Sequence, residues 1–134
     1  MSFQAPEAAP PWRVETLQAP SNRRDSSSDP PSGETVLTIV DDFGVTRDLE
    51  HGLETGSVAR ETWRMHPGDP LSAQGHAHWT QTLRRGNWHV RTEAFSAMRS
   101  AAEMFYLDGR VEAYENNQLI FSKDFSENIQ RNFL

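Results

Sequence analysis

Past the first quarter of the chain, apolar and polar residues alternate with a period of two. Successive side chains of a β-strand point to opposite faces, so this period is typical of strands with one half-buried face. In the segment 59–65, Trp63 and Met65 share one face, and the residues beside them are polar. No long helical period separates such segments, which argues against a parallel α/β sheet.

About seven strands with short links are predicted, at residues 35–40, 45–49, 59–65, 77–84, 88–95, 105–114 and 119–125. Short links favour sequential antiparallel pairing. The expected fold is therefore all-β, a strongly twisted meander that curls into an open barrel or a sandwich of two sheets. Residues 41–44 are predicted as a turn and 66–70 as a loop. For 96–103, a strand with an irregular connection is favoured over a helical turn.

The first 33 residues hold six of the eight prolines and the serine run 26–28. Such a segment has few side chains to bury against the cost of ordering its backbone. We therefore expect residues 1–33 to be a Pro/Ser-rich linker or extended tail, and residues 34–134 to form one antiparallel β domain.

Composition narrows the function classes. The formal net charge is −6 and no basic stripe stands out, so nucleic-acid binding is not expected. No apolar run is long enough for a membrane span, and no signal peptide is visible. The chain has no cysteine, which excludes disulfides, thiolate nucleophiles and cysteine-type zinc sites. These features fit a cytoplasmic protein without a cofactor.

The segment 75–93 holds three histidines and two tryptophans, and reads as a hairpin with a turn near Gly86. With Arg85 and Gly86 as central turn residues, Leu83 faces Trp88 and His78 faces Glu93. Shifting the turn changes the partners but not the faces, so one side is apolar and the other polar.

The histidines belong to the polar side. His76 and His78, with Glu93 nearby, have spacing that suits a metal, but no third converging ligand is evident. His89 as a general base would need an orienting partner and a cleft. The favoured interpretation is a solvent-exposed strand face with ordinary polar residues, with no metal and no catalytic residue.

The tryptophans belong to the apolar side, where a filled core is favoured over a ligand site. The alternative is a cup for a small apolar ligand, with indole walls and polar groups at its base. Its candidate residues are Trp63, Trp79, Gln81, Trp88 and Thr92.

The last hairpin is predicted to have a three-residue loop, 115–117, with Asn117 in the left-handed conformation and a bulge. This loop aligns the apolar rows of the two strands. Tyr106 and Tyr114 then point to the opposite face and are candidate interface residues. Asp42-Phe43-Gly44 matches a kinase triplet but lacks its context, and no Gly-x-Ser-x-Gly or catalytic triad is present.

Several ordered phrases resemble the C-terminal region of large bacterial acyl hydrolases of the CocE/NonD group, which includes cocaine esterase and X-prolyl dipeptidyl peptidase relatives. They are "DDFG", "HPGDPLSA", "WTQTLRRGNWHVRTE", "GRVEAYENNQLIFSKDF" and "IQRNFL". The resemblance implies that the Ser, Asp and His of the triad belong to an upstream hydrolase domain, and none of them carries over to this chain.

The residues and the resemblance together predict a non-catalytic accessory β domain that works by docking, oligomerisation or shaping access to an active site. Its expected partner is a hydrolase domain or a second copy of itself. The alternative is a freestanding β-cup that binds a small apolar ligand. A small enzyme using His78 or His89 is a third possibility, and it requires a cleft at one of these residues.

Overall fold

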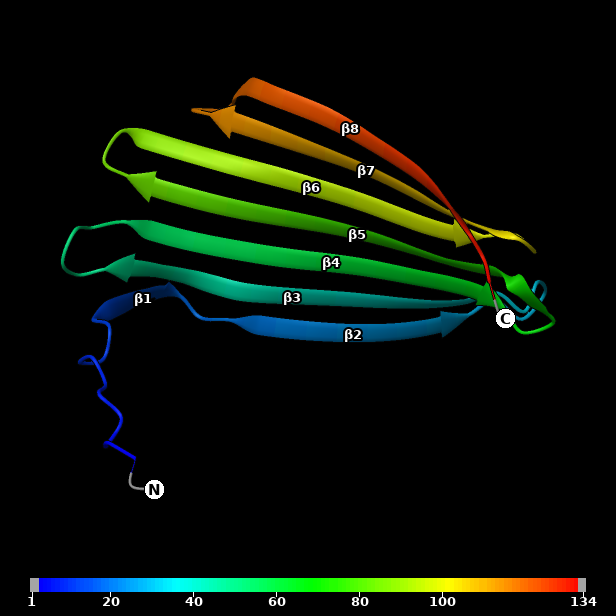
Figure 1. The fold of residues 1–134 in the computed structure, drawn as a ribbon, viewed down its shortest axis with the longest axis horizontal. Coiled ribbons are helices and arrows are strands. Elements are labelled where there is room, and N and C mark those ends of the chain that lie inside the picture. The colour runs from blue at the N-terminus through cyan, green and yellow to red at the C-terminus, as the bar shows by residue number, and fades with distance from the viewer. Residues whose placement is uncertain (1–2, 133–134) are drawn as a thin grey trace.

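The computed structural model describes residues 3–132, which form one antiparallel sheet (Figure 1). Its strands are β1 (Val14–Gln18), β2 (Ser21–Ser28), β3 (Thr35–Asp48), β4 (Glu54–His66), β5 (Asp69–Arg85), β6 (Trp88–Ser100), β7 (Met104–Glu115) and β8 (Gln118–Gln130). Strands β3 to β8 are neighbours in chain order, and β1 and β2 both pair with β3. The predicted all-β antiparallel meander is confirmed, and it is not closed into a barrel. Met1, Ser2, Phe133 and Leu134, at the ends of the two predicted regions, lie outside the described residues.

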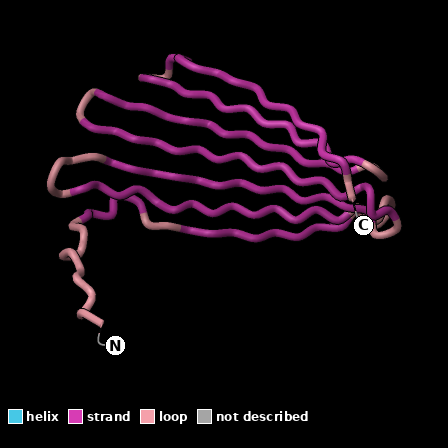
Figure 2. The backbone as a smooth tube through the Cα atoms, viewed as in Figure 1, coloured by secondary structure: helices cyan, strands magenta, loops and turns pink. Residues whose placement is uncertain are grey.

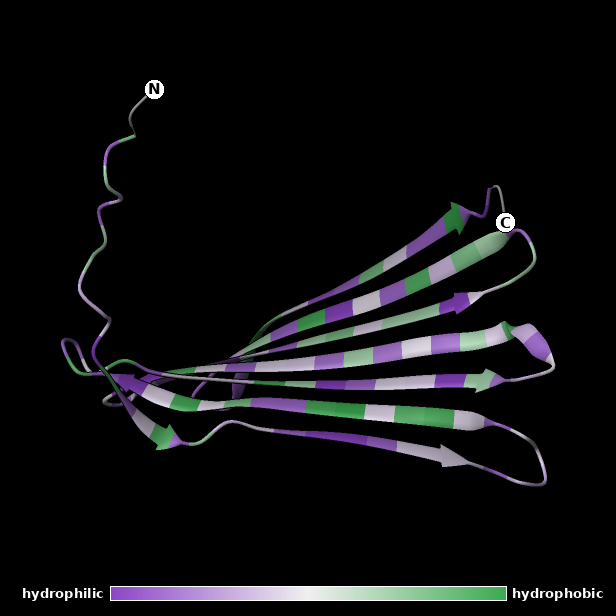
Figure 3. Cartoon of the chain, turned by 90° about the horizontal axis from the view of Figure 1, so that it is seen from below, coloured by the Kyte–Doolittle hydropathy of each residue, from purple (hydrophilic) through white to green (hydrophobic). Residues whose placement is uncertain are grey.

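The described chain makes a single layer. Short turns join the long strands (Figure 2), and hydrophobic and hydrophilic bands alternate along them (Figure 3). Within residues 3–132, Ala59 is the one apolar side chain that is buried. The expectation of a filled barrel or sandwich interior is therefore wrong for this chain, because alternation sorts side chains between faces but cannot bring a second layer onto either face.

Residues 1–33 are not a tail throughout. β2 pairs with β3 from Ser21 opposite Asp42 to Ser28 opposite Thr35, and β1 continues the same edge. An edge strand needs hydrogen bonds to its neighbour more than buried side chains, so a serine-rich sequence can form one. Pro20 lies in the break between β1 and β2, where a missing N–H is tolerated. The predicted tail is thus reduced to the segment before β1.

The predicted turn at residues 41–44 is a bulge inside β3. Pairing with β4 shifts between Asp42 and Val45, and Gly44 has a φ of 76°. The Gly44 N–H donates to Asp42 Oδ1 at 2.8 Å. A Cβ on Gly44 would meet the Gln18 carbonyl oxygen and lie 2.9 Å from the Pro20 nitrogen. The bulge therefore matches the break between β1 and β2 on the neighbouring edge.

The hairpin β5–β6 turns at Gly86 and Asn87, because Arg85 pairs with Trp88. Leu83 consequently pairs with Val90 rather than with Trp88. The predicted register is wrong by two residues on β6, although the predicted faces are kept, since a two-residue shift preserves side-chain direction. β6 continues to Ser100, so the ambiguous segment 96–103 is a strand followed by a short connection, as favoured.

The hairpin β7–β8 has a two-residue loop in place of the predicted three. Asn116 and Asn117 have φ angles of 47° and 66°, as a type I′ turn requires. The left-handed Asn117 is confirmed. The predicted bulge is also present, but it lies in the strands: pairing shifts so that Ala113 stays opposite Phe121. The strands absorb the extra residue that the loop was expected to hold.

Candidate functional site

The two faces of the sheet differ in chemistry. Residues that pair across strands share a face, so the register assigns each side chain to one of them. The apolar face carries Leu37, Trp63, Trp79, Leu83, Met98, Leu107, Val111, Phe121, Phe125 and Ile129. The polar face carries Arg60, His76, His78, Thr80, Arg91, Glu93, Tyr106, Arg110, Glu112 and Tyr114.

All five residues of the predicted cup lie on the apolar face, and the indoles there are open to solvent. Trp63, Trp79 and Trp88 are 45%, 40% and 43% exposed. The Trp79 ring stacks on Phe43 with 5.7 Å between centroids. The indoles therefore share a surface, and the expectation that they pack into an interior is wrong.

Two separate hollows divide the predicted cup. Trp63 lines a hollow of about 550 Å³ near the start of β5, together with Leu37, Met98 and Phe105. Gln81 and Thr92 line another of about 320 Å³ near the β5–β6 turn. Among the described residues, none lines both hollows. Trp79 and Trp88 line neither of these two hollows. The predicted cup residues thus share a face but do not surround one cavity.

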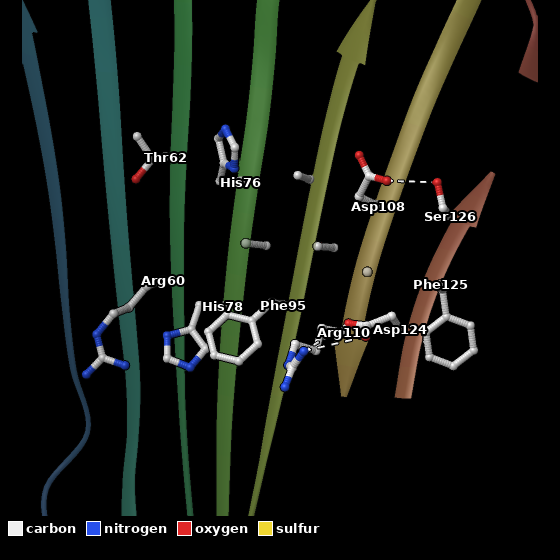
Figure 4. Close-up of a pocket in the computed structure, with 14 residues that line it drawn as sticks. Arg60, Thr62, His76, His78, Phe95, Asp108, Arg110, Asp124, Phe125 and Ser126 are labelled. Carbon is white, nitrogen blue, oxygen red and sulfur yellow. Dashed lines mark hydrogen bonds and ion pairs between the residues drawn. The ribbon is translucent and has the colours of Figure 1, made fainter. Parts of the chain in front are cut away.

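The polar face has its own hollow of about 610 Å³, which crosses β4 to β8 (Figure 4). The His78 ring stacks on Phe95 with centroids 4.3 Å apart. Arg110 reaches Asp124 at 3.2 Å, and Ser126 donates to Asp108 at 2.9 Å. Arg60, on the strand beside His78, brings a second guanidinium to the rim. The hollow is therefore lined by charged groups of both signs.

Glu93 joins the polar groups of β5 and β6. Glu93 as a residue is 8% exposed, and its carboxylate contacts His78 Nε2 at 2.6 Å and accepts hydrogen bonds from Thr80 Oγ1 at 2.7 Å and from Arg91. Burial alone would raise the pKa of Glu93, but the hydrogen bonds from Thr80, His78 and Arg91 outweigh it and lower that pKa. Glu93 is thus an ionised carboxylate held by three partners. The predicted cross-strand pairing of His78 with Glu93 is wrong by two residues, because His78 pairs with Phe95 and Thr80 pairs with Glu93. The side chains of His78 and Glu93 still meet diagonally, since a two-residue shift keeps both on the same face.

The same network continues onto β7. The Tyr114 hydroxyl donates to Glu112 at 2.6 Å, and Arg110 Nε donates to the same carboxylate at 2.6 Å. These two hydrogen bonds lower the pKa of Glu112. The hydrogen bond to Glu112 in turn raises the pKa of Tyr114.

Tyr106 and Tyr114 lie on the polar face, as predicted, but neither is an exposed anchor. The Arg99 guanidinium lies 4.0 Å from the Tyr106 ring centroid, and Arg91 lies 4.0 Å from that of Tyr114. Both tyrosines are half-buried under these cations. Their role at an interface stays a prediction.

The geometry limits the chemistry available to His78. Glu93 supplies an orienting carboxylate and the hollow supplies access, which are two requirements for a general base. The nearby Thr80 hydroxyl, however, donates to Glu93. Within residues 3–132, no three His, Cys, Asp or Glu side chains gather closely enough to hold a metal ion. The groups around His78 form a stabilising network, and within that described range no hydroxyl nucleophile is bonded to the imidazole.

One anchor was missed because it lies in the predicted tail. Trp12 Nε1 donates to Asp48, and the backbone N–H groups of Glu50 and His51 donate to Asp48 Oδ1 at 2.7 and 3.0 Å. Burial of Asp48 opposes ionisation, but these hydrogen bonds prevail and lower its pKa. A tryptophan amid prolines was the signal that this part of the chain has a packing partner.

Comparison with known proteins gives no further identification: no family model, no curated protein and no solved structure matches this chain. Across the described residues, no helix is long and apolar enough to cross a membrane.

Proposed function

We propose that this chain is a non-catalytic interaction domain whose apolar face is covered by a protein partner. The observation that carries the proposal is the exposure of large apolar side chains across one continuous face, among them Trp63, Met98 and Phe125. Six strands about 4.8 Å apart and about twelve residues long give a face of about 1,100 Å². Continuous apolar patches above a few hundred Å² mark interaction sites.

The polar face supports the same proposal because several of its charged groups are engaged with one another. Glu93 and Glu112 each have at least two partners, and Arg110 bonds two carboxylates. Such a face stays stable in contact with water. The resemblance to the C-terminal region of acyl hydrolases adds a partner class, a hydrolase domain or a second copy, with the catalytic residues supplied elsewhere.

The test uses the absence of cysteine, which makes single-cysteine variants selective probes. Ser96→Cys places a thiol on the apolar face and Ser122→Cys places one on the polar face, and both serines are exposed. Maleimide labelling is measured for the chain alone and after mixing with a purified CocE/NonD-type hydrolase. We expect maleimide to label the Ser96→Cys variant more slowly than the Ser122→Cys variant under at least one of the two conditions, the chain alone or the chain mixed with the hydrolase.

Equal labelling rates at the two positions in both arms would overturn the interaction domain. A parallel assay with p-nitrophenyl acetate tests the non-catalytic part. No turnover above buffer is expected, and turnover that disappears in His78→Gln would show that the chain is an enzyme.

A second candidate, binding of a small apolar ligand, is favoured by the 550 Å³ hollow beside Trp63 and Met98. Pockets for small ligands have this size and an apolar lining with few polar groups. Saturable one-to-one binding of an anilinonaphthalene dye by a monomeric chain would support this candidate. Binding of many dye molecules per chain would instead indicate an open interaction surface.

A further inference from the structure

The chain exposes more surface than its mass accounts for. Its accessible surface is 10203 Å² for 15.2 kDa. A compact folded chain of this mass exposes about 7,100 Å², so the excess is about 3,000 Å². An uncovered sheet face of about 1,100 Å² corresponds to about a third of that excess.

This inference rests on the proposed function and names the partner. We propose that a second copy of the chain covers the apolar face, so that two sheets pack face to face about a two-fold axis parallel to the strands. The axis passes between β5 and β6, so three strands (β3 to β5) lie on one side of it and three (β6 to β8) on the other. Two such faces together bury about 2,200 Å², within the range of about 2,000–5,000 Å² found in obligate homodimers.

The proposed axis gives shape complementarity at its centre. It exchanges the places of β5 and β6, so Trp79 of one copy lies over Ala94 of the other, because these residues are directly paired within each sheet. In the same way Met98 faces Gly75, and the Trp63 ring lies over that glycine. Large groups therefore meet small ones, and the Met98 thioether meets an indole.

Two polar side chains near the axis also find partners. Gln81 and Thr92 are paired across β5 and β6 and would face each other between the copies. An amide and a hydroxyl can exchange a hydrogen bond, which removes the cost of covering them.

Charge is arranged in the same complementary sense. Asp41 on β3 and Lys123 on β8 lie at the same level along the strands, because successive cross-strand partners on β4 to β7 connect them. The two-fold axis brings β8 of one copy over β3 of the other, so Lys123 approaches Asp41, which within its own chain also pairs with Arg24 at 3.5 Å. Self-complementary charge at both edges favours a second copy over an unrelated partner.

The primary test is the mass of the purified chain in solution, measured by light scattering after size exclusion. A dimer of twice 15.2 kDa is expected. A monomer across the micromolar range overturns this inference. In that case, maleimide labelling of the single-cysteine variants in the presence of the hydrolase tests the proposed function separately.

Matched variants locate the interface. Ala94→Arg puts a cation on the apolar face of β6 and should dissociate the dimer, whereas Ala97→Arg on the polar face of the same strand should not. Lys123→Glu should raise the dimer dissociation constant about tenfold, and adding Asp41→Lys should restore it. These milder changes keep the test decisive if Ala94→Arg unfolds the chain. A dimer that Ala97→Arg dissociates, or that neither Ala94→Arg nor Lys123→Glu weakens, overturns the proposed face.

Discussion

Glu93 shows how single residues stabilise this sheet. A buried carboxylate is costly unless its oxygens are bonded, and here Thr80, His78 and Arg91 supply the bonds. The carboxylate ties β5 to β6 and, through Arg91, to the Tyr114 ring on β7. These contacts hold three strands of the polar face together.

We expect Glu93→Gln to lower the free energy of unfolding by about 1–3 kcal/mol, because a neutral amide cannot satisfy three donors. Urea denaturation at pH 7 measures the change. Glu115→Gln, at an exposed position beside the last turn, is the matched control and should change stability little. Equal effects of the two substitutions would contradict the role given to Glu93.

The same residue determines a pH dependence. The pKa of Glu93 is lower in the folded chain than in the unfolded chain. Its stabilising effect is therefore complete above the unfolded carboxyl pKa of about 4.3 and is lost as the pH falls through the folded pKa. Glu93→Gln should show a smaller loss of stability on acidification than the parent chain. The remaining loss reports Asp48 and Glu112, whose pKa values are lowered as well.

At the scale of elements, β-bulges and tight turns adjust strands that are unusually long. β5 has 17 residues, whereas most strands have about five or six. The bulge at Gly44 lets β3 continue past the break at Pro20, and the bulge near Ala113 keeps the apolar rows aligned. The bulges therefore let long strands stay paired with their apolar side chains on one face, and the sheet remains open.

Gly44→Ala should destabilise the β1–β3 edge, because it adds a methyl group against the Gln18 and Pro20 backbone at a positive φ. The expected loss is about 1–3 kcal/mol. Gly52→Ala is the matched control, since Gly52 has a φ of 74° but no described atom within 4 Å of the added Cβ. Thermal unfolding and amide exchange of β1 measure the difference. A Gly52→Ala effect as large as that of Gly44→Ala would assign the loss to backbone conformation alone.

At the scale of the whole molecule, the sheet is a single layer whose apolar face is exposed and whose strand β3 has a covered edge. β1 and β2 protect the edge of β3, whose residues 35–40 read "TVLTIV". An uncovered edge with this β-rich, uncharged sequence is a template for intermolecular pairing. Residues 14–28 of the Pro/Ser-rich start are therefore part of the fold.

Removing residues 1–33 should expose the β3 edge and cause aggregation, detected as scattering and thioflavin fluorescence at micromolar concentration. Removing residues 1–11, which spares Trp12 and both edge strands, should leave the chain soluble and equal in stability. A soluble, well-folded 34–134 fragment would show that the edge strands are dispensable.

The amino-acid sequence by itself determined which side chains share a face. A period of two assigns Trp63 and Trp79 to one side and His78 and Glu93 to the other, whatever the register. The left-handed Asn117 was likewise predictable, because few residues besides glycine accept a positive φ. Pairing partners were not predictable, since a two-residue slip keeps every side chain on its face.

Only the tertiary structure decided that residues 14–28 join the sheet and that the apolar face stays open. Edge pairing depends on backbone hydrogen bonds, which leave no apolar pattern in a serine-rich strand. Closure of the sheet depends on the total twist accumulated over six long strands, and this total twist cannot be predicted from local residue spacing.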